Sequence, residues 1–165
     1  MILTIFLSLV VCGAVSLMMI SGIAFIQDIR MFSSAPKEAR EVLIPRDKEL
    51  FYGARTIGWV LAIFSFAMIL GSLTIAILDG FRSGFTFWQY FMRIVIMFTL
   101  YKVYDMIFFD YFLLMRFHFF QHYYPEIENV FKGRKYGFNI KSQLLKLFII
   151  FPIVSAFIAW ICTML

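Results

Sequence analysis

The chain has 165 residues, of which 62% are hydrophobic and 22 are Phe, and it carries a net charge of +5. Its mean hydropathy of +0.87 lies well above that of soluble domains, whose surfaces must meet water. These values exclude a soluble globular protein and predict a single all-α membrane domain over residues 1–165. The basic residues gather between apolar stretches, so the positive charge does not indicate nucleic-acid binding.

The first predicted element is a membrane helix over residues 2–26. Crossing the hydrocarbon core takes about 20 apolar residues in a helix, and this stretch is long enough. It lacks a basic segment before its apolar core, and that core is longer than the core of a signal peptide. We therefore expect an uncleaved membrane helix.

Residues 27–55 form a charged segment that is predicted to contain a short surface helix. Ser34 is the expected cap, Pro36 falls in the first turn, and Pro45 ends the helix. The mixed charges predict an element in water or among lipid headgroups. It is interpreted as a plain connector, with docking of a partner as the alternative.

The second predicted membrane helix covers residues 56–78. Ala54, Gly58 and Ala62 follow one another at four-residue spacing at its start. Small residues on one stripe let two helices approach closely. The stripe is interpreted as packing within the chain, with a dimerisation face, and hence a homo-oligomer, as the alternative.

The third predicted membrane helix, residues 86–117, contains five ionisable side chains: Arg93, Lys102, Asp105, Asp110 and Arg116. An ionised Arg, Lys or Asp at the centre of a membrane helix costs roughly 2.5–3.5 kcal/mol. Each Leu, Ile, Val or Phe returns only roughly 0.3–0.6 kcal/mol. This helix is therefore not expected to face lipid on all sides, and it requires partners, water or a bend.

A helical wheel at about 100° per residue places Lys102, Asp105 and Arg116 on one face. Lys102 and Asp105 are three residues apart, within reach of an ion pair, whereas Asp110 points away and requires a separate partner. We interpret the five residues as an intramembrane polar site, either a path or a binding cavity. The alternative is a structural ion pair that sets the helix register, with Asp110 at the cytoplasmic interface.

The same stretch allows a second topology, in which the membrane part ends near residue 105. MIFFDYFLLMRFHFF, residues 106–120, then lies along the inner leaflet as an interfacial helix. The aromatic density also raises the hypothesis of a pocket for a hydrophobic ligand, although lipid-facing rings are the simpler interpretation. The residues concerned are Phe108, Phe109, Phe112, Phe117, Phe119 and Phe120.

The two histidines, His118 and His122, are four residues apart and share one face if the helix continues. Glu126 follows Pro125, which breaks the helix and allows the carboxylate to fold back. Together the three residues form the two-His, one-carboxylate set of some catalytic zinc sites, so they predict a site for a single divalent metal ion. The alternative, which is favoured, is a pair of interfacial histidines that contact headgroup phosphates.

The fourth predicted membrane helix covers residues 144–165, with a kink at Pro152. The fold is therefore expected to be an all-α bundle of four membrane helices. Residues 27–55 and 118–143 carry six and four basic residues, whereas residues 79–85 carry only Arg82. The positive-inside rule therefore places these two long loops in the cytoplasm and both termini outside. Trp59, Trp88 and Trp160 fall near segment ends, where interfacial aromatic belts form.

The run FFDYFLL…HYYPE, followed by YGFNIKSQLLKL, resembles a pattern in small four-helix bacterial membrane proteins that have no assigned role. The likeness covers roughly residues 85–165. It implies a four-helix layout and a location in the bacterial inner, or plasma, membrane. It implies no activity, so no residue role follows from it.

Three classes of function fit these features. The first is a small transporter, channel or ligand-binding membrane protein that uses the ionisable residues of the third helix, and it is favoured. The second is a membrane-embedded enzyme with a metal or acid–base site at the cytoplasmic face, formed by Asp110, His118, His122 and Glu126. The third is an accessory subunit of a larger membrane complex.

Overall fold

The computed structural model describes residues 1–32, 35–134 and 140–164, and every regular element among them is a helix. Three helical stretches are long and apolar enough to cross a membrane: Ile2–Ile26, Ala54–Arg82 and Lys141–Met164. The predicted all-α fold is confirmed for these residues. The predicted first, second and fourth membrane helices each have a counterpart.

The long helices are built from α-helical and π-helical parts. They are α1 (Ile2–Ile20) continuing into η1 (Ser21–Ile26), α3 (Ala54–Arg82), α4 (Phe87–Tyr104) continuing into η3 (Asp105–Arg116), and α7 (Ile140–Leu145) continuing through η5 (Lys146–Ile150) into α8 (Phe151–Met164). The last of these begins four residues before its expected start. The interfacial topology requires the third helix to break near residue 105. No break occurs there, because η3 continues the helix to Arg116.

Pro152 explains one of the π-helical turns. A proline has no N–H to donate to the preceding turn, and its ring crowds the carbonyl of that turn. The turn before Pro152 is η5, where the helix widens and relieves this crowding. A π-helical turn thus precedes Pro152, and the kink itself stays a prediction. The π-helical parts η1 and η3 contain no proline, and we have no local explanation for them.

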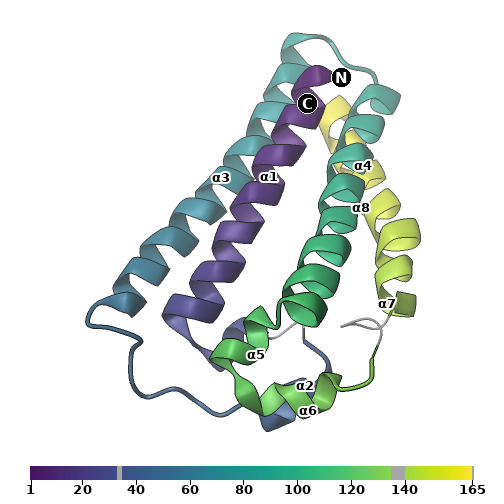
Figure 1. The fold of residues 1–165 in the computed structure, drawn as a ribbon. Coiled ribbons are helices and arrows are strands. Elements are labelled where there is room, and N and C mark those ends of the chain that lie inside the picture. The colour runs from purple at the N-terminus through teal and green to yellow at the C-terminus, as the bar shows by residue number, and fades with distance from the viewer. Residues whose placement is uncertain (33–34, 135–139, 165) are drawn as a thin grey trace.

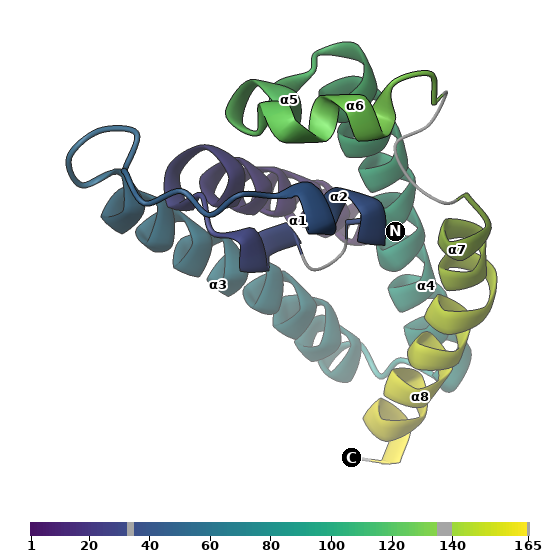
Figure 2. The ribbon, with the colours of Figure 1, turned by 90° about the horizontal axis from the view of Figure 1, so that it is seen from below.

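The four long helices lie in a curved row in the order α3, α1, α4, α8 (Figures 1 and 2). α1 packs against α3 and α4, and α8 packs chiefly against α4. The predicted four-helix bundle is therefore not confirmed: the helices form an open row, because α3 and α8 do not meet to close it (Figure 2). The outward side chains of α3 and α8 are apolar and exposed. In lipid such surfaces have no hydrophobic reason to close on each other.

A small layer of short elements, which we name the cap, covers one end of the row, and both termini lie at the other end (Figure 1). The cap consists of α2 (Lys37–Val42), α5 (Phe119–Tyr123), η4 (Pro125–Ile127) and α6 (Glu128–Phe131). Its apolar side chains form one buried cluster with Ile23 of η1 and Leu114 of η3. Arg46 joins its two halves through a 2.8 Å ion pair with Glu126.

The predicted surface helix corresponds to α2, the part of the cap that precedes α3. It begins at Lys37 after Pro36 and ends at Val42, before Pro45. The expected cap residue, Ser34, lies outside the described residues. Ala39 is buried against the rest of the cap, whereas Lys37 and Glu41 pair in solvent. This helix is therefore a docked element of the cap, more than a connector.

The small-residue stripe at the start of α3 packs inside the chain. Ala54 is fully buried. A Cβ atom on Gly58 would lie 2.7 Å from Cγ1 of Ile26 and 2.9 Å from Cβ of Phe25, so only glycine allows this close approach. The interpretation as intramolecular packing is thus confirmed at these two positions. A homo-oligomer stays a prediction, but this stripe no longer supports it.

Candidate functional site

The ionisable residues of the third helix separate into distinct groups along its length. Arg93 lies near the end of α4 that is remote from the cap. Its guanidinium donates to Oδ2 of Asp79 at 2.7 Å and to the carbonyl of Ala76 at 2.8 Å, and it lies 4.3 Å from the ring centroid of Phe85. All these partners belong to α3 or to the turn after it. Arg93 therefore ties α3 to α4 and is removed from the other ionisable residues.

Lys102 and Asp105 form the ion pair that their spacing predicts, at the junction of α4 and η3. The lysine is buried, with 5% of the residue exposed, and the aspartate is half-buried. Tyr104 directly precedes Asp105, and its Oη lies 2.7 Å from Oγ of Ser16 on α1. The third helix thus has polar side-chain contacts within itself, between Lys102 and Asp105, and with α1, through Tyr104.

Asp110 of η3 is also buried, with 8% of the residue exposed. Nε2 of Gln143 on α7 donates to its Oδ2 at 3.4 Å. The charges of Lys102, Asp105 and Lys146 are close enough to act on this carboxylate. The separate partner that Asp110 was expected to require is therefore Gln143, which sequence reasoning had placed at the end of a loop.

These side chains constitute the inner polar cluster: Lys102, Asp105, Asp110, Gln143 and Lys146. Gln143 is itself buried, and its Oε1 has no hydrogen-bond partner within the described part of the chain. A buried amide oxygen without a donor is unfavourable by about 1–3 kcal/mol. The cluster therefore presents an acceptor oxygen, beside a carboxylate, to any bound group that can donate.

The remaining predicted site residues lie outside this cluster. Arg116 is exposed at the cap end of η3 and forms no ion pair with a described carboxylate. The wheel that grouped it with Asp105 assumed an α-helix, but the segment is a π-helix, which changes the angle between successive residues. Grouping Arg116 with Lys102 and Asp105 is thus wrong for this structure.

His118, His122 and Glu126 do not come together as metal ligands. His118 has a left-handed backbone conformation, with φ of 51°, between η3 and α5, and both histidines are exposed. The carboxylate of Glu126 accepts from Arg46 at 2.8 Å and from the backbone N–H of Ile44 at 3.1 Å. Among the described residues no group of three or more His, Cys, Asp and Glu side chains is arranged to hold a metal ion. The three residues therefore do not form the predicted metal site in this structure.

The cap also contains a perturbed phenol. Tyr124 is fully buried in the apolar cluster of the cap, and the guanidinium of Arg46 lies 5.3 Å from its ring centroid. Burial raises the pKa of Tyr124 to about 12, although the positive charge of Arg46 opposes the shift. The phenol is therefore neutral at physiological pH, as its apolar surroundings require.

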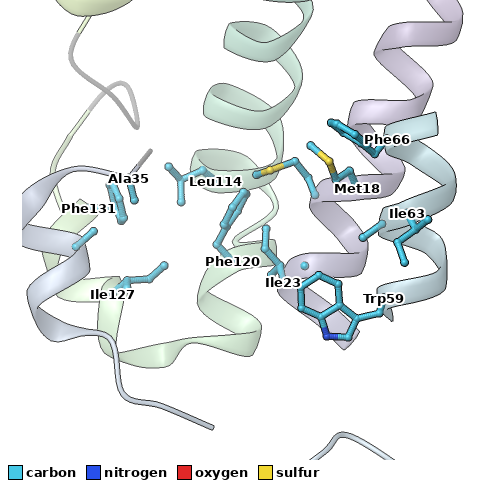
Figure 3. A pocket seen from close by; sticks show the side chains of 14 residues that line it. Met18, Ile23, Ala35, Trp59, Ile63, Phe66, Leu114, Phe120, Ile127 and Phe131 are labelled. Carbon is cyan, nitrogen blue, oxygen red and sulfur yellow. The ribbon is translucent and has the colours of Figure 1, made fainter. Parts of the chain in front are cut away.

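A cavity of about 360 Å³ lies between the cap and the helices α1 and α3 (Figure 3). Among the described residues, none of the side chains that line it is charged. Phe120, one of the aromatic residues singled out in the sequence, is among them, whereas Phe109 is buried in another cluster, between α1 and α4. Sequence reasoning did not find this cavity, because its walls come from five separate parts of the chain.

Comparison of the chain with protein-family models, with curated proteins and with solved structures found no match. The residues and geometry described above are therefore the basis on which a function is assigned.

Proposed function

We propose that the chain is a four-helix protein of a bacterial inner membrane, with both termini outside and the cap in the cytoplasm. Three helices have the length and composition of membrane spans, and both termini lie at one end of the row. The basic loops are at the cap end, as the positive-inside rule requires for a cytoplasmic cap. Trp59, Trp88 and Trp160 are exposed near helix ends, where an aromatic belt would contact headgroups.

The fourth crossing in this proposal is the stretch Phe87–Arg116, formed by α4 and η3. It runs between the same two ends of the molecule as α3 (Figure 1). Its charged residues argue against it by composition alone, but Arg93, Lys102 and Asp110 are all buried against other helices. A buried and paired charge avoids most of the cost of contact with lipid. Packing thus supports a span that composition disfavours.

Within this arrangement the protein is a small transporter of protons or small cations, and the inner polar cluster is its site. The observation that carries this proposal is the buried pair of Asp110 and Gln143, in which no described residue donates to the Gln143 Oε1. Ionisable residues inside membrane segments are rare, and they commonly mark ion pathways and proton relays. Lys102 and Asp105 neutralise each other, which leaves Asp110 as the group that takes up the transported charge.

Proton flux into proteoliposomes tests this function. The protein is reconstituted in vesicles that contain a pH-sensitive dye, and a potassium gradient with valinomycin drives protons inward. We expect the wild-type protein to acidify the lumen faster than protein-free vesicles do. Asp110→Asn should reduce the rate to that of protein-free vesicles, because the amide cannot carry the charge. Asp47→Asn, in an exposed loop, is the matched control and should retain the wild-type rate.

Two results would overturn the proposal. One is the absence of transport of any of the tested cations. The wild-type protein would then move protons no faster than protein-free vesicles, and it would also give no flux of sodium or ammonium when a gradient of either ion replaces the proton gradient. The other is a folded Asp110→Asn protein that transports at the wild-type rate. A single symmetric peak in size-exclusion chromatography shows that the variant is folded.

An accessory subunit is the second candidate, and the open row of helices favours it. α8 packs chiefly against α4, and only 11% of its span is buried within the chain. A partner helix would cover the surface that α8 leaves open. Purification in a mild detergent should then retain a stoichiometric partner chain, whereas a clean monomer or homo-oligomer would count against this role.

A further inference from the structure

The cavity between α1, α3 and the cap is closed on one side and open on the other. On the cap side, Ile23, Ile127 and Phe131 are almost completely buried. On the α3 side, Trp59 is 48%, Ile63 66% and Phe66 56% exposed. The lining side chains of α3 are therefore partly exposed at the surface of the molecule, and Figure 3 shows Trp59, Ile63 and Phe66 among the side chains around the cavity. In the proposed topology this surface faces lipid, so the cavity opens sideways into the membrane.

The chemistry of the walls selects an apolar occupant. The lining side chains that the structure describes carry no charge. The volume of about 360 Å³ lies within the range of small-molecule sites, roughly 300–1,000 Å³. At about 30 Å³ for a group the size of water, it holds roughly a dozen methylene-sized groups. Met18 and Met19 supply flexible side chains that adapt to a mobile chain. A single acyl chain meets all of these conditions.

Positive charge flanks the cavity on two sides. Arg55 lies one helical turn before Trp59 on α3, so the two side chains share a face. The guanidinium of Arg134 lies 5.9 Å from the ring centroid of the lining residue Phe131. Neither arginine pairs with a carboxylate of the described chain; Arg55 donates instead to the carbonyls of Arg46 and Asp47. Their charges are thus available to an anion at the mouth.

We propose that this cavity is a binding site for one acyl chain of an anionic phospholipid, whose phosphate lies beside Arg55. The apolar walls exclude a polar ligand, and the sideways opening admits a lipid directly from the membrane. The guanidinium of Arg55 donates charge-assisted hydrogen bonds to the phosphate. It favours a lipid with net negative charge, because the choline of phosphatidylcholine would bring a second positive charge close to this arginine. The bound lipid fills the space between the cap and the helices, so it also stabilises the packing of the cap against them.

Native mass spectrometry of the delipidated protein tests this site. Dioleoyl phosphatidylglycerol and dioleoyl phosphatidylcholine are titrated separately, and the bound lipids are counted. We expect one retained phosphatidylglycerol, bound about tenfold more tightly than phosphatidylcholine, because only phosphatidylcholine brings a positive choline close to Arg55. Arg55→Gln should remove this preference. Arg82→Gln, an exposed arginine at the other end of α3, should keep it.

Filling the cavity provides the second arm of the test. Ala62→Phe places a ring into the cavity and should abolish retention of the lipid. Ala67→Phe makes the same change at an exposed position of α3 outside the cavity, and it should retain the lipid. If Ala62→Phe does not fold, Ala35→Leu fills the cavity from the cap side instead.

Several outcomes would overturn the proposal. Equal retention of phosphatidylglycerol by wild type and the folded filling variants would show that lipid binds elsewhere. Equal affinity of the wild type for the two lipids would show that Arg55 does not select the headgroup. A lipid-free dimer that Ala62→Phe dissociates would make a second copy the occupant. These readouts are independent of proton flux, so the site and the proposed transport function fail or stand separately.

Discussion

The ionisable residues of the third helix differ in the partners that satisfy their charges. Lys102 and Asp105 satisfy each other within one turn, whereas Asp110 and Arg93 depend on side chains from other helices. Arg93 is the most completely satisfied of them, with an ion pair, a carbonyl and an aromatic ring around one guanidinium. Its role is therefore to hold α3 and α4 together, which is a structural role with a measurable free energy.

Replacing Arg93 with methionine should destabilise the protein without affecting the inner polar cluster. The change removes hydrogen bonds to a charged group, which are worth about 2 kcal/mol in total, since the partly exposed Asp79 can recover water. For a chain of this size that corresponds to a fall in the thermal midpoint of roughly 4–8 °C. Arg93→Met is compared with Arg82→Met, whose side chain is exposed, by thermal unfolding in detergent. Equal midpoints for the two variants would contradict the role assigned to Arg93.

At the scale of elements, the helices change character at the cap end. η1, η3 and η5 all lie in the halves of their helices that approach the cap. π-helical turns occur frequently at functional sites, and here η3 and η5 carry Asp110 and Lys146 of the inner polar cluster. The contact between η1 and α3 is equally specific, because Gly58 allows the two backbones to approach closely.

Gly58→Ala should therefore weaken the contact between η1 and α3. The new methyl group would overlap Ile26 and Phe25, and overpacking of this kind costs about 1–3 kcal/mol. Gly71→Ala is the matched control, since it lies on the same helix with no atom within 4 Å of its added Cβ. That change should leave stability unaltered or raise it by about 0.5–1 kcal/mol, because alanine favours a helix over glycine. The free energies of unfolding in a mixed-detergent titration compare the two, and a loss shared by both would contradict the close approach at Gly58.

At the scale of the whole molecule, the open row and the cap define two different ends. The cap end has the basic loops, the cavity and the inner polar cluster nearby, and the other end has both termini and the Arg93 contact. An even number of crossings is the simplest way to place both termini on one side of a membrane. The topology thus depends on whether the stretch Phe87–Arg116 crosses.

Labelling of single cysteines measures this topology directly. In a background in which Cys12 and Cys162 are alanine, Lys37→Cys, Ser83→Cys and Lys132→Cys each place a thiol at an exposed position. A membrane-impermeant maleimide added to intact cells should label only Ser83→Cys. The other two variants should react only after permeabilisation. Labelling of Lys132→Cys in intact cells would show that Phe87–Arg116 does not cross, and the reverse pattern at all three would invert the orientation.

The sequence by itself determined the features that depend on neighbours along the chain. Apolar runs of sufficient length specify three helices that are long and apolar enough to cross a membrane, and spacing alone specifies the pair of Lys102 and Asp105, because both are local properties. Only the tertiary structure decided that Gln143 contacts Asp110, from 33 residues away, and that α3 and α8 stay apart. A π-helix in the third segment also broke the angular periodicity that placed Arg116. The cavity likewise exists only once α1, α3 and the cap have packed, since no single element contains its walls.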